Sequence, residues 1–206
     1  MSKKIEDKYK KLDDIEHVIL KPSMYIGSTK SHSTTKWLLN IDKFEKREVT
    51  YNPGFLKLID EIVINSIDES KRPESKLNIV NINIIDNKIT VWDNGGIPVV
   101  KHKEYNEYIP EIIFSNMRAG SNFTESDDRT WSGTNGVGSS IVNIFSKEFI
   151  VSTSDGKNQF TQIFSNNMRD RTKAKITKST KQFTEISFTP DLERFGLSKI
   201  HYAHVL

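Results

Sequence analysis

Hydrophobic and polar positions along this 206-residue chain change their period several times, and each change predicts an element. Residues 53–70 have helical periodicity, at about 100° per residue. Four apolar residues share one face of such a helix: Leu56, Ile59, Val63 and Ile67. Four polar residues share the opposite face: Glu61, Asn65, Asp68 and Glu69. The segment therefore predicts an amphipathic helix with an acidic and amide-bearing side.

Strand-like runs follow this helix. They predict strands at 77–85, 89–92, 147–153, 159–165 and 183–188. The turn Asp86-Asn87-Lys88 joins the first two strands as a hairpin, and Asp155-Gly156 is a strong hairpin signal between the next two. Antiparallel neighbours are therefore expected.

Further helices are predicted around the strands. Residues 1–20 have roughly helical spacing, and 21–27 form a turn or extended arm. Short helices are expected at 110–117, where Pro110 stands near the start, and at 137–146. The polar segment 118–136 is too long for a plain connector. This order favours a layered α+β sandwich over a doubly wound parallel sheet.

The composition narrows the class of protein. Thirty basic and 27 acidic residues give a net charge of +3, too balanced for a nucleic-acid footprint by itself. There are no cysteines, which excludes disulfides and thiolate metal sites. The Lys-rich start lacks the apolar run of a signal peptide, and no apolar stretch approaches the length of a membrane span. We expect a soluble intracellular protein, or a segment cut from a longer one.

The polar face of the 53–70 helix is the first candidate site. Glu61 beside a water can act as a general base, which contributes roughly 10²–10⁴ in rate. The amide oxygen of Asn65 is a hard ligand that suits Mg²⁺. Taken alone, this face has an ordinary alternative as a solvated surface.

The second candidate is Asp93-Asn94-Gly95-Gly96-Ile97-Pro98, directly after the predicted 89–92 strand. The strand would deliver Asp93 to a cavity edge, where a carboxylate can accept a hydrogen bond from the exocyclic amine of adenine. The glycines allow a sharp turn and close approach of a ligand. The alternative is an ordinary β-turn, which Asp-Asn-Gly forms readily.

The third candidate is Gly133-Thr134-Asn135-Gly136-Val137-Gly138-Ser139-Ser140, which leads into the 137–146 helix. Its backbone N–H groups and the start of the helix could form a phosphate cradle. It is not a P-loop, because no Lys-Ser/Thr pair follows the last glycine, and its spacing is not that of a dinucleotide fingerprint. The alternative is a flexible loop that ends in a helix.

The order and spacing of the three motifs resemble those of the GHKL ATPases. Asp14-Ile15-Glu16-His17-Val18 and the segment 21–28 also resemble the N-terminal arm of type IIA DNA topoisomerases. Further matches are typical of the eukaryotic and T-even-type phage branch: 97–103, 108–114, 136–146 and 188–192. The resemblance covers about residues 10–196, and the chain is identified as a member of this family, closest to the phage large subunit and the eukaryotic enzyme.

The resemblance implies a fold and a division of the chain. The fold would be a two-layer α/β sandwich of the GHKL (Bergerat) type, with a mixed, mostly antiparallel sheet and helices on one face. Residues 1–28 would form the N-terminal arm and 29–206 the ATPase domain, with the transducer and DNA-cleavage regions absent.

The resemblance also implies a role for each matching residue. Glu61 would be the general base for water attack on the γ-phosphate, Asn65 would hold Mg²⁺, and Asp93 would contact the adenine amine. Segment 115–135 would be the ATP lid. Other implied nucleotide contacts are Asp68, Gly95, Gly96, Ile97, Ser121, Asn122, Asn135, Gly136, Val137, Gly138, Ser139, Ser140 and Thr184.

Two departures from the family pattern qualify these roles. Gly95 and Gly96 are adjacent, whereas the family has one residue between these glycines, so the turn beside the adenine pocket must be tighter. A Lys from the following transducer domain reaches the γ-phosphate in the family, and no transducer is expected within these 206 residues. Because a cation there stabilises developing charge, we hypothesise that the chain alone hydrolyses ATP slowly.

The implied activity is that of an ATP-hydrolysing type II DNA topoisomerase, whose ATPase domain is a dimerisation clamp for duplex passage. The implied partners are duplex DNA, a second copy on ATP binding, and other topoisomerase domains or subunits, with no membrane. The implied location is intracellular: host cytoplasm for a phage protein, nucleus for a eukaryotic one. The basic run 169–181 is interpreted as a solvated loop rather than a DNA contact.

Two alternatives remain from the sequence. One is an ATPase of the chaperone or mismatch-repair type with the same fold. The other is a nucleotide-dependent dimerisation module without turnover.

Overall fold

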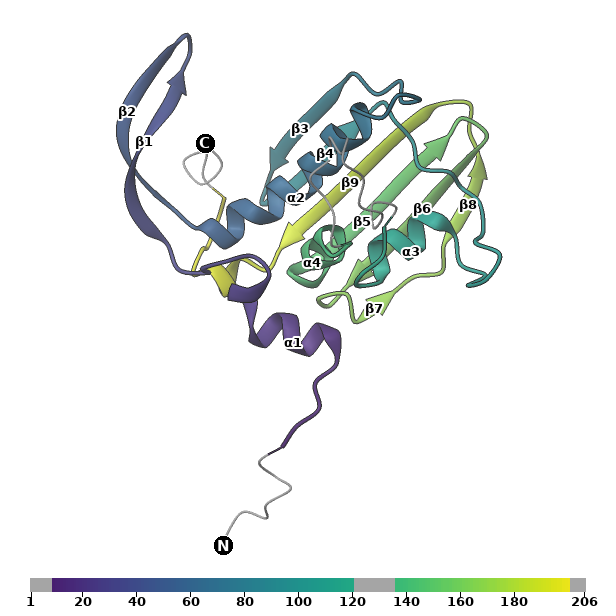
Figure 1. The fold of residues 1–206 in the computed structure, drawn as a ribbon, viewed down its shortest axis with the longest axis horizontal. Helices are drawn as coiled ribbons and strands as arrows, with labels where there is room; N and C mark the ends of the chain where they lie inside the picture. Colours follow the sequence, from purple (N-terminus) through teal and green to yellow (C-terminus); the bar gives the residue numbers. More distant parts are fainter. Residues whose placement is uncertain (1–8, 121–135, 201–206) are drawn as a thin grey trace, which may run out of the picture.

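The computed structural model describes residues 9–120 and 136–200 and has two layers, a sheet and a layer of helices (Figure 1). The α-helices are α1 (Asp14–Leu20), α2 (Pro53–Ser70), α3 (Ile109–Ser115) and α4 (Gly138–Ile144), with short 3₁₀ helices at Pro22–Met24 and Leu192–Phe195. The strands are β1 (His32–Asn40), β2 (Lys43–Tyr51), β3 (Val80–Ile85), β4 (Lys88–Asp93), β5 (Ser146–Asp155), β6 (Asn158–Ser165), β7 (Asp170–Arg171), β8 (Lys175–Lys178) and β9 (Gln182–Pro190).

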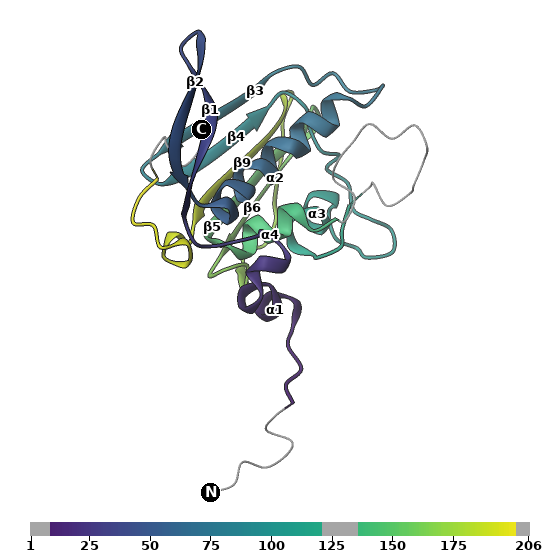
Figure 2. The same cartoon turned by 60° about the vertical axis from the view of Figure 1, so that its left-hand side comes forward.

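The main sheet has the strand order β3-β4-β9-β5-β6-β7, and β8 also pairs with β6. All its pairings between described strands are antiparallel. Helices α2, α3 and α4 lie over one face of this sheet (Figures 1 and 2). The predicted α+β sandwich and both predicted hairpins are therefore confirmed.

Aromatic rings fill the space between the two layers. Phe149 of β5 is fully buried, and its ring centroid lies 5.9 Å from that of Phe114 on α3. The rings of Phe164 and Phe188, on the neighbouring strands, each lie 6.3 Å from Phe149. These contacts hold α3 against the strands of the sheet. None of the helices in the described part of the chain combines the length and apolar character that a membrane crossing requires.

The buried face of α2 differs from the predicted one. The residues it buries include Phe55, Leu58, Ile59, Ile62 and Ser66. Ile67, expected in the apolar stripe, is 41% exposed. The reason is that Phe55, near the start of the helix, packs against Phe195 at 5.9 Å between ring centroids, and Ser66 is bonded to a buried carboxylate. Because of these tertiary contacts, the buried face of α2 is shifted by about one residue from the face that the apolar periodicity predicts.

Strand β3 is shorter than predicted, because it begins at Val80 rather than at residue 77. The side-chain oxygen of Asn94 accepts hydrogen bonds from the backbone N–H groups of Asn78 and Ile79, at 3.0 and 2.9 Å. A side chain thus replaces a strand partner at this end of β3 and holds the segment beside the end of β4.

A second sheet, formed by β1 and β2, was not predicted. The two strands pair antiparallel from His32 opposite Tyr51 to Asn40 opposite Lys43. They project from one end of α2, away from the main sheet (Figures 1 and 2). Their tight turn contains Ile41 at a φ of 59°, which is unusual for a branched residue and gives no glycine signal in the sequence.

Candidate functional site

One cavity of about 720 Å³ lies between α2, α4 and the adjoining ends of β4 and β9. Eleven of the predicted site residues line it: Glu61, Asn65, Asp68, Asp93, Gly96, Ile97, Gly136, Val137, Gly138, Ser139 and Thr184. Gly95 and Ser140 do not line it, and Ser121, Asn122 and Asn135 lie outside the described residues. Three segments far apart in the sequence therefore share one hollow.

Glu61 meets the glycine-rich segment directly. A Cβ added at Gly138 would overlap the Glu61 carboxylate, so only glycine lets the start of α4 approach α2 this closely. The other carboxylate oxygen pairs with Lys57 Nζ at 2.6 Å, one helical turn earlier. The Glu61 side chain is 22% exposed, so it is accessible from the cavity. This geometry permits a general base beside a backbone loop.

Asn65 joins the same two helices one turn further on. Its Nδ2 donates to Ser139 Oγ at 2.9 Å. Because Oδ1 lies on the other branch of the planar amide, that oxygen is not used in this contact and can face a ligand in the cavity. Ser140, the next residue, instead donates to Val137 O at 3.0 Å and is buried, which explains why it does not line the cavity.

Asp93 stands at the opposite end of the cavity, where β4 ends. Its Oδ2 accepts from Ser66 Oγ at 2.6 Å, and its Oδ1 accepts from Gly95 N at 2.9 Å. Burial raises the pKa of Asp93, and hydrogen bonds from Ser66 and from the backbone N–H groups of Gly95 and Thr184 partly offset this rise. The carboxylate is thus held in one orientation on α2 and on its own turn.

The turn after Asp93 packs closely against β5. Gly96 has a φ of +155°, and a Cβ there would overlap the Ser154 carbonyl oxygen on β5. Ile97 N then donates to Thr153 Oγ1 at 3.0 Å. The turn therefore packs directly on the end of β5, and Gly96 and Ile97 form part of the cavity wall.

The two ends of the predicted lid segment meet at the cavity. Ala119 N donates to Gly136 O at 2.9 Å, and both residues line the cavity. Gly136 has a φ of +61°, in the left-handed region that favours glycine. The predicted lid itself falls mostly outside the described residues.

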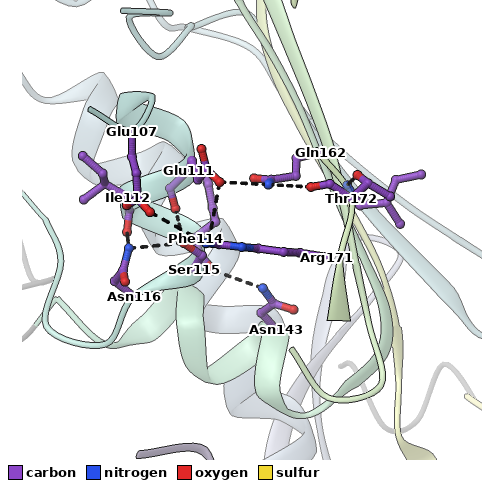
Figure 3. Close-up of polar contacts among 11 residues, drawn as sticks. Glu107, Glu111, Ile112, Phe114, Ser115, Asn116, Asn143, Gln162, Arg171 and Thr172 are labelled. Atoms are coloured by element: carbon purple, nitrogen blue, oxygen red, sulfur yellow. Dashed lines mark hydrogen bonds and ion pairs between the residues drawn. The ribbon is translucent and has the colours of Figure 1, made fainter. Parts of the chain in front are cut away.

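A polar network holds α3, the helix that precedes this lid segment, against the sheet (Figure 3). Gln162 Nε2 donates to Glu111 Oε1 at 3.1 Å and to Thr172 O at 2.9 Å. Arg171 Nη1 lies 3.5 Å from the same Glu111 oxygen and donates to Ser115 Oγ at 3.2 Å. One carboxylate on α3 is therefore bound by β6 and β7 together, which fixes one wall of the site.

The cavity lining is acidic at several points. Glu69 pairs with Arg72 at 2.9 Å, and burial raises the pKa of Glu69. Among the described residues, no group of three or more His, Cys, Asp or Glu side chains could hold a metal by itself. An anionic ligand in this cavity would therefore need a cation to balance its charge. That cation would in turn take some of its oxygen ligands from the anionic ligand itself.

Several residues of the cavity were not predicted from the sequence. Met24 and Tyr25, in the arm, line the cavity, and Tyr25 Oη is 2.8 Å from His17 Nδ1 on α1. Segment 21–28 was singled out from the sequence only as an arm, because its place beside the cavity depends on the fold. Ser66 lies within the α2 motif, next to Asn65, and could have been found had the buried face of the helix been known.

Relatives and solved structures match this chain over nearly its whole length. No family model matches the sequence. The chain is 39% identical over 205 residues to the DNA topoisomerase 2 of Arabidopsis thaliana, which covers 96% of this chain and 14% of the relative. It is 38% identical over 208 residues to the DNA topoisomerase 2 of Acanthamoeba polyphaga mimivirus, which covers 95% of this chain and 16% of that relative.

The solved structures that resemble this chain are also ATPase regions of topoisomerase II. The ATPase region of Saccharomyces cerevisiae topoisomerase II bound to ICRF-187 superposes with a TM-score of 0.91 at 33% identity, covering 96% of this chain and 55% of that one. The ATPase and transducer domains of Balamuthia mandrillaris topoisomerase II give a TM-score of 0.89 at 35% identity, covering 97% and 53%. The chain thus spans about half of these solved regions and a small part of the curated relatives.

Proposed function

This chain belongs to the type IIA DNA topoisomerase family, in its GHKL ATPase region, and we propose that it binds ATP in the cavity between α2 and α4 and hydrolyses it. The observation that carries the proposal is the contact between Glu61 and Gly138. It joins a carboxylate that can deprotonate water to the loop that can hold phosphates, inside a hollow large enough for a nucleotide.

The proposed roles follow the two ends of the cavity. Asp93 accepts a hydrogen bond from the adenine amine, and Gly96, Ile97 and Thr184 surround the base. At the other end, the 136–139 segment binds the phosphates through backbone N–H groups. Glu61 holds a water and takes its proton, and its pairing with Lys57 keeps the carboxylate oriented across one turn of α2.

Mg²⁺ fits this donor set. When bound, it would offset phosphate charge, and Asn65 Oδ1 would be its ligand from this chain. Support comes from the Asn65 to Ser139 hydrogen bond, which leaves that oxygen unused by this contact. The cavity lining also carries more carboxylates than basic side chains, so a bound cation would offset the charge of a triphosphate. A single amide oxygen suffices, because Mg²⁺ usually takes most of its ligands from phosphates and water.

The activity of a whole enzyme goes beyond this chain. We propose that ATP binding brings two copies of the domain together as a clamp, that duplex DNA is the substrate of the full enzyme, and that other topoisomerase domains or subunits complete it. The proposed location is intracellular, in the host cytoplasm for a T-even-type phage protein or in the nucleus for a eukaryotic one. We also propose that this chain alone turns over slowly, because the transducer Lys would supply the missing cation.

The test measures ATP binding and phosphate release by the full-length protein, with and without duplex DNA. We expect Mg²⁺-dependent hydrolysis that DNA stimulates. Hydrolysis that DNA leaves unchanged would favour a chaperone-type or mismatch-repair-type ATPase, and binding without phosphate release would favour a dimerisation module. Turnover by this chain equal to that of a version carrying a transducer domain would overturn the slow-hydrolysis proposal.

A further inference from the structure

The hydroxyl groups at the Asp93 end of the cavity each have one hydrogen, and the partner of each hydrogen decides whether a bound base meets a donor or an acceptor there. Ser66 has one hydroxyl hydrogen, and it lies between Ser66 Oγ and Asp93 Oδ2, 2.6 Å apart. Asp93 Oδ1 accepts from Gly95 N. With the backbone N–H of Thr184, three protein donors thus hold the carboxylate, which leaves about one of its four acceptor positions for a ligand.

The hydroxyl hydrogens of the neighbouring Thr153 and Thr184 are also used within the protein. Thr153 Oγ1 donates its only hydrogen to Phe183 O at 3.0 Å. The contact between Thr153 Oγ1 and Thr184 Oγ1, also 3.0 Å, must then be donated by Thr184. Thr153 accepts in addition from Ile97 N. Neither hydroxyl therefore has a hydrogen left for a ligand, and Thr184, which lines the cavity, offers only lone pairs to it.

We propose that Ser66 is a positioning residue that makes this end of the cavity accept only a hydrogen-bond donor, and so selects a purine with an amine at position 6. The inference rests on the proposed function, since it assumes that the base of the nucleotide meets Asp93. Ser66 acts through Asp93: its O–H fixes the carboxylate and occupies the side that faces α2.

Loss of the Ser66 hydroxyl has a specific chemical consequence. Asp93 Oδ2 would lie in a buried place without its donor, at 5% exposure for the residue as a whole. A buried carboxylate that loses a hydrogen bond takes up a proton or a water more readily. Either one places a donor at this end of the cavity, and a donor there can meet the 6-oxo oxygen of inosine. The preference for adenine then falls.

The experiment compares ATP with inosine triphosphate (ITP), which carries the same triphosphate but an oxygen at position 6. Dissociation constants are measured by titration calorimetry for the full-length protein and for Ser66→Ala. We expect the unaltered protein to prefer ATP by at least about 100-fold, and Ser66→Ala to reduce this ratio by about tenfold. Ser66→Cys, of similar size with a weak donor, should reduce the ratio as well and replaces Ser66→Ala if that variant does not fold.

Two further variants separate positioning from a general loss of structure. Ser66→Thr retains the hydroxyl and should restore most of the ratio. Ser70→Ala lies one turn along α2, where the serine bonds only Ile67 O in the described structure, and should leave the ratio unchanged. Variants at Ser66 that weaken ATP and ITP equally would overturn the inference and leave ATP binding intact as a proposal. If the unaltered protein binds neither nucleotide, the proposed function fails and the inference with it.

Discussion

Apolar side chains are usually buried and polar ones exposed, and the cavity and the β1–β2 hairpin depart from this rule in opposite ways. At the cavity, Asp93 and Ser66 are buried polar groups that bond to each other. On the hairpin, Trp37 is 66% exposed and Phe44 is 69% exposed, although both are large and apolar. The register places Trp37, Leu39 and Phe44 on the same face of the hairpin, because cross-strand partners share a face.

The acidic groups show the same contrast. Burial raises the pKa of Asp93, whereas hydrogen bonds from Arg47 and Asn40 lower the pKa of Glu45 on the hairpin. A carboxylate in water is charged at little cost in free energy, whereas a buried carboxylate must be compensated by hydrogen bonds or a counter-charge. Polar contacts therefore hold the structure around the cavity, whereas we expect the exposed face of the hairpin to contribute little to the stability of this chain.

Replacement of Glu61 by Gln gives the largest expected effect. The substitution preserves shape beside Gly138 and removes the base, so hydrolysis by the full-length protein should fall roughly 10²–10⁴-fold. ATP affinity should change by less than about threefold, since the phosphates are held by backbone groups. Phosphate release and equilibrium binding are the measurements. Retained hydrolysis would remove the role assigned to Glu61.

Asn52 tests whether the root of the hairpin differs from its exposed face. Its Nδ2 donates to Thr29 O and Phe195 O, at 2.6 and 3.1 Å, and its Oδ1 caps α2 at Phe55 N. Asn52→Ala should lower the free energy of unfolding by about 2–4 kcal/mol, from the lost cap and two deprived carbonyls. Asn52→Asp keeps the cap oxygen, but it places a buried carboxylate oxygen, which cannot donate, against the Thr29 and Phe195 carbonyls, so it should be at least as destabilising as Asn52→Ala. Urea unfolding decides, and a change below about 0.5 kcal/mol for Asn52→Ala would contradict the account.

Gly138→Ala tests the close approach of α2 and α4. The added Cβ must displace the Glu61 carboxylate, so we expect both ATP affinity and turnover to fall, affinity by about tenfold. Gly156→Ala is the matched control, because that glycine has a φ of +85° with nothing near its absent Cβ. It should cost stability by about 1 kcal/mol without changing affinity. Equal affinities for the two variants would show that the contact has no bearing on binding.

The smallest expected effect comes from the hairpin face. Trp37→Ser and Phe44→Ser should each change the free energy of unfolding of this chain by less than about 0.5 kcal/mol, since neither ring is buried. Phe149→Ala, in the core, should cost about 3–5 kcal/mol. Urea unfolding of the three variants compares them. A large loss from either hairpin variant would show that the exposed face supports the fold after all.

Much of this arrangement was predictable from the sequence. The helix at 53–70 and the two hairpins have strong periodicity and turn signals, and the three motifs were expected around one cavity. The β1–β2 hairpin was not predicted, because its turn, at Ile41, contains neither glycine nor Asn-Gly. The hydrogen-bond positions of Ser66 and Thr153 also could not be predicted, since they depend on contacts between elements distant in sequence.

The most direct test of the central claim is a crystal structure of the protein with Mg²⁺ and a non-hydrolysable ATP analogue. We expect the adenine amine within hydrogen-bond distance of Asp93, the phosphates along 136–139, and a water between Glu61 and the γ-phosphate. A nucleotide bound elsewhere, or one whose base lies at Glu61 and whose phosphates lie at Asp93, would contradict it.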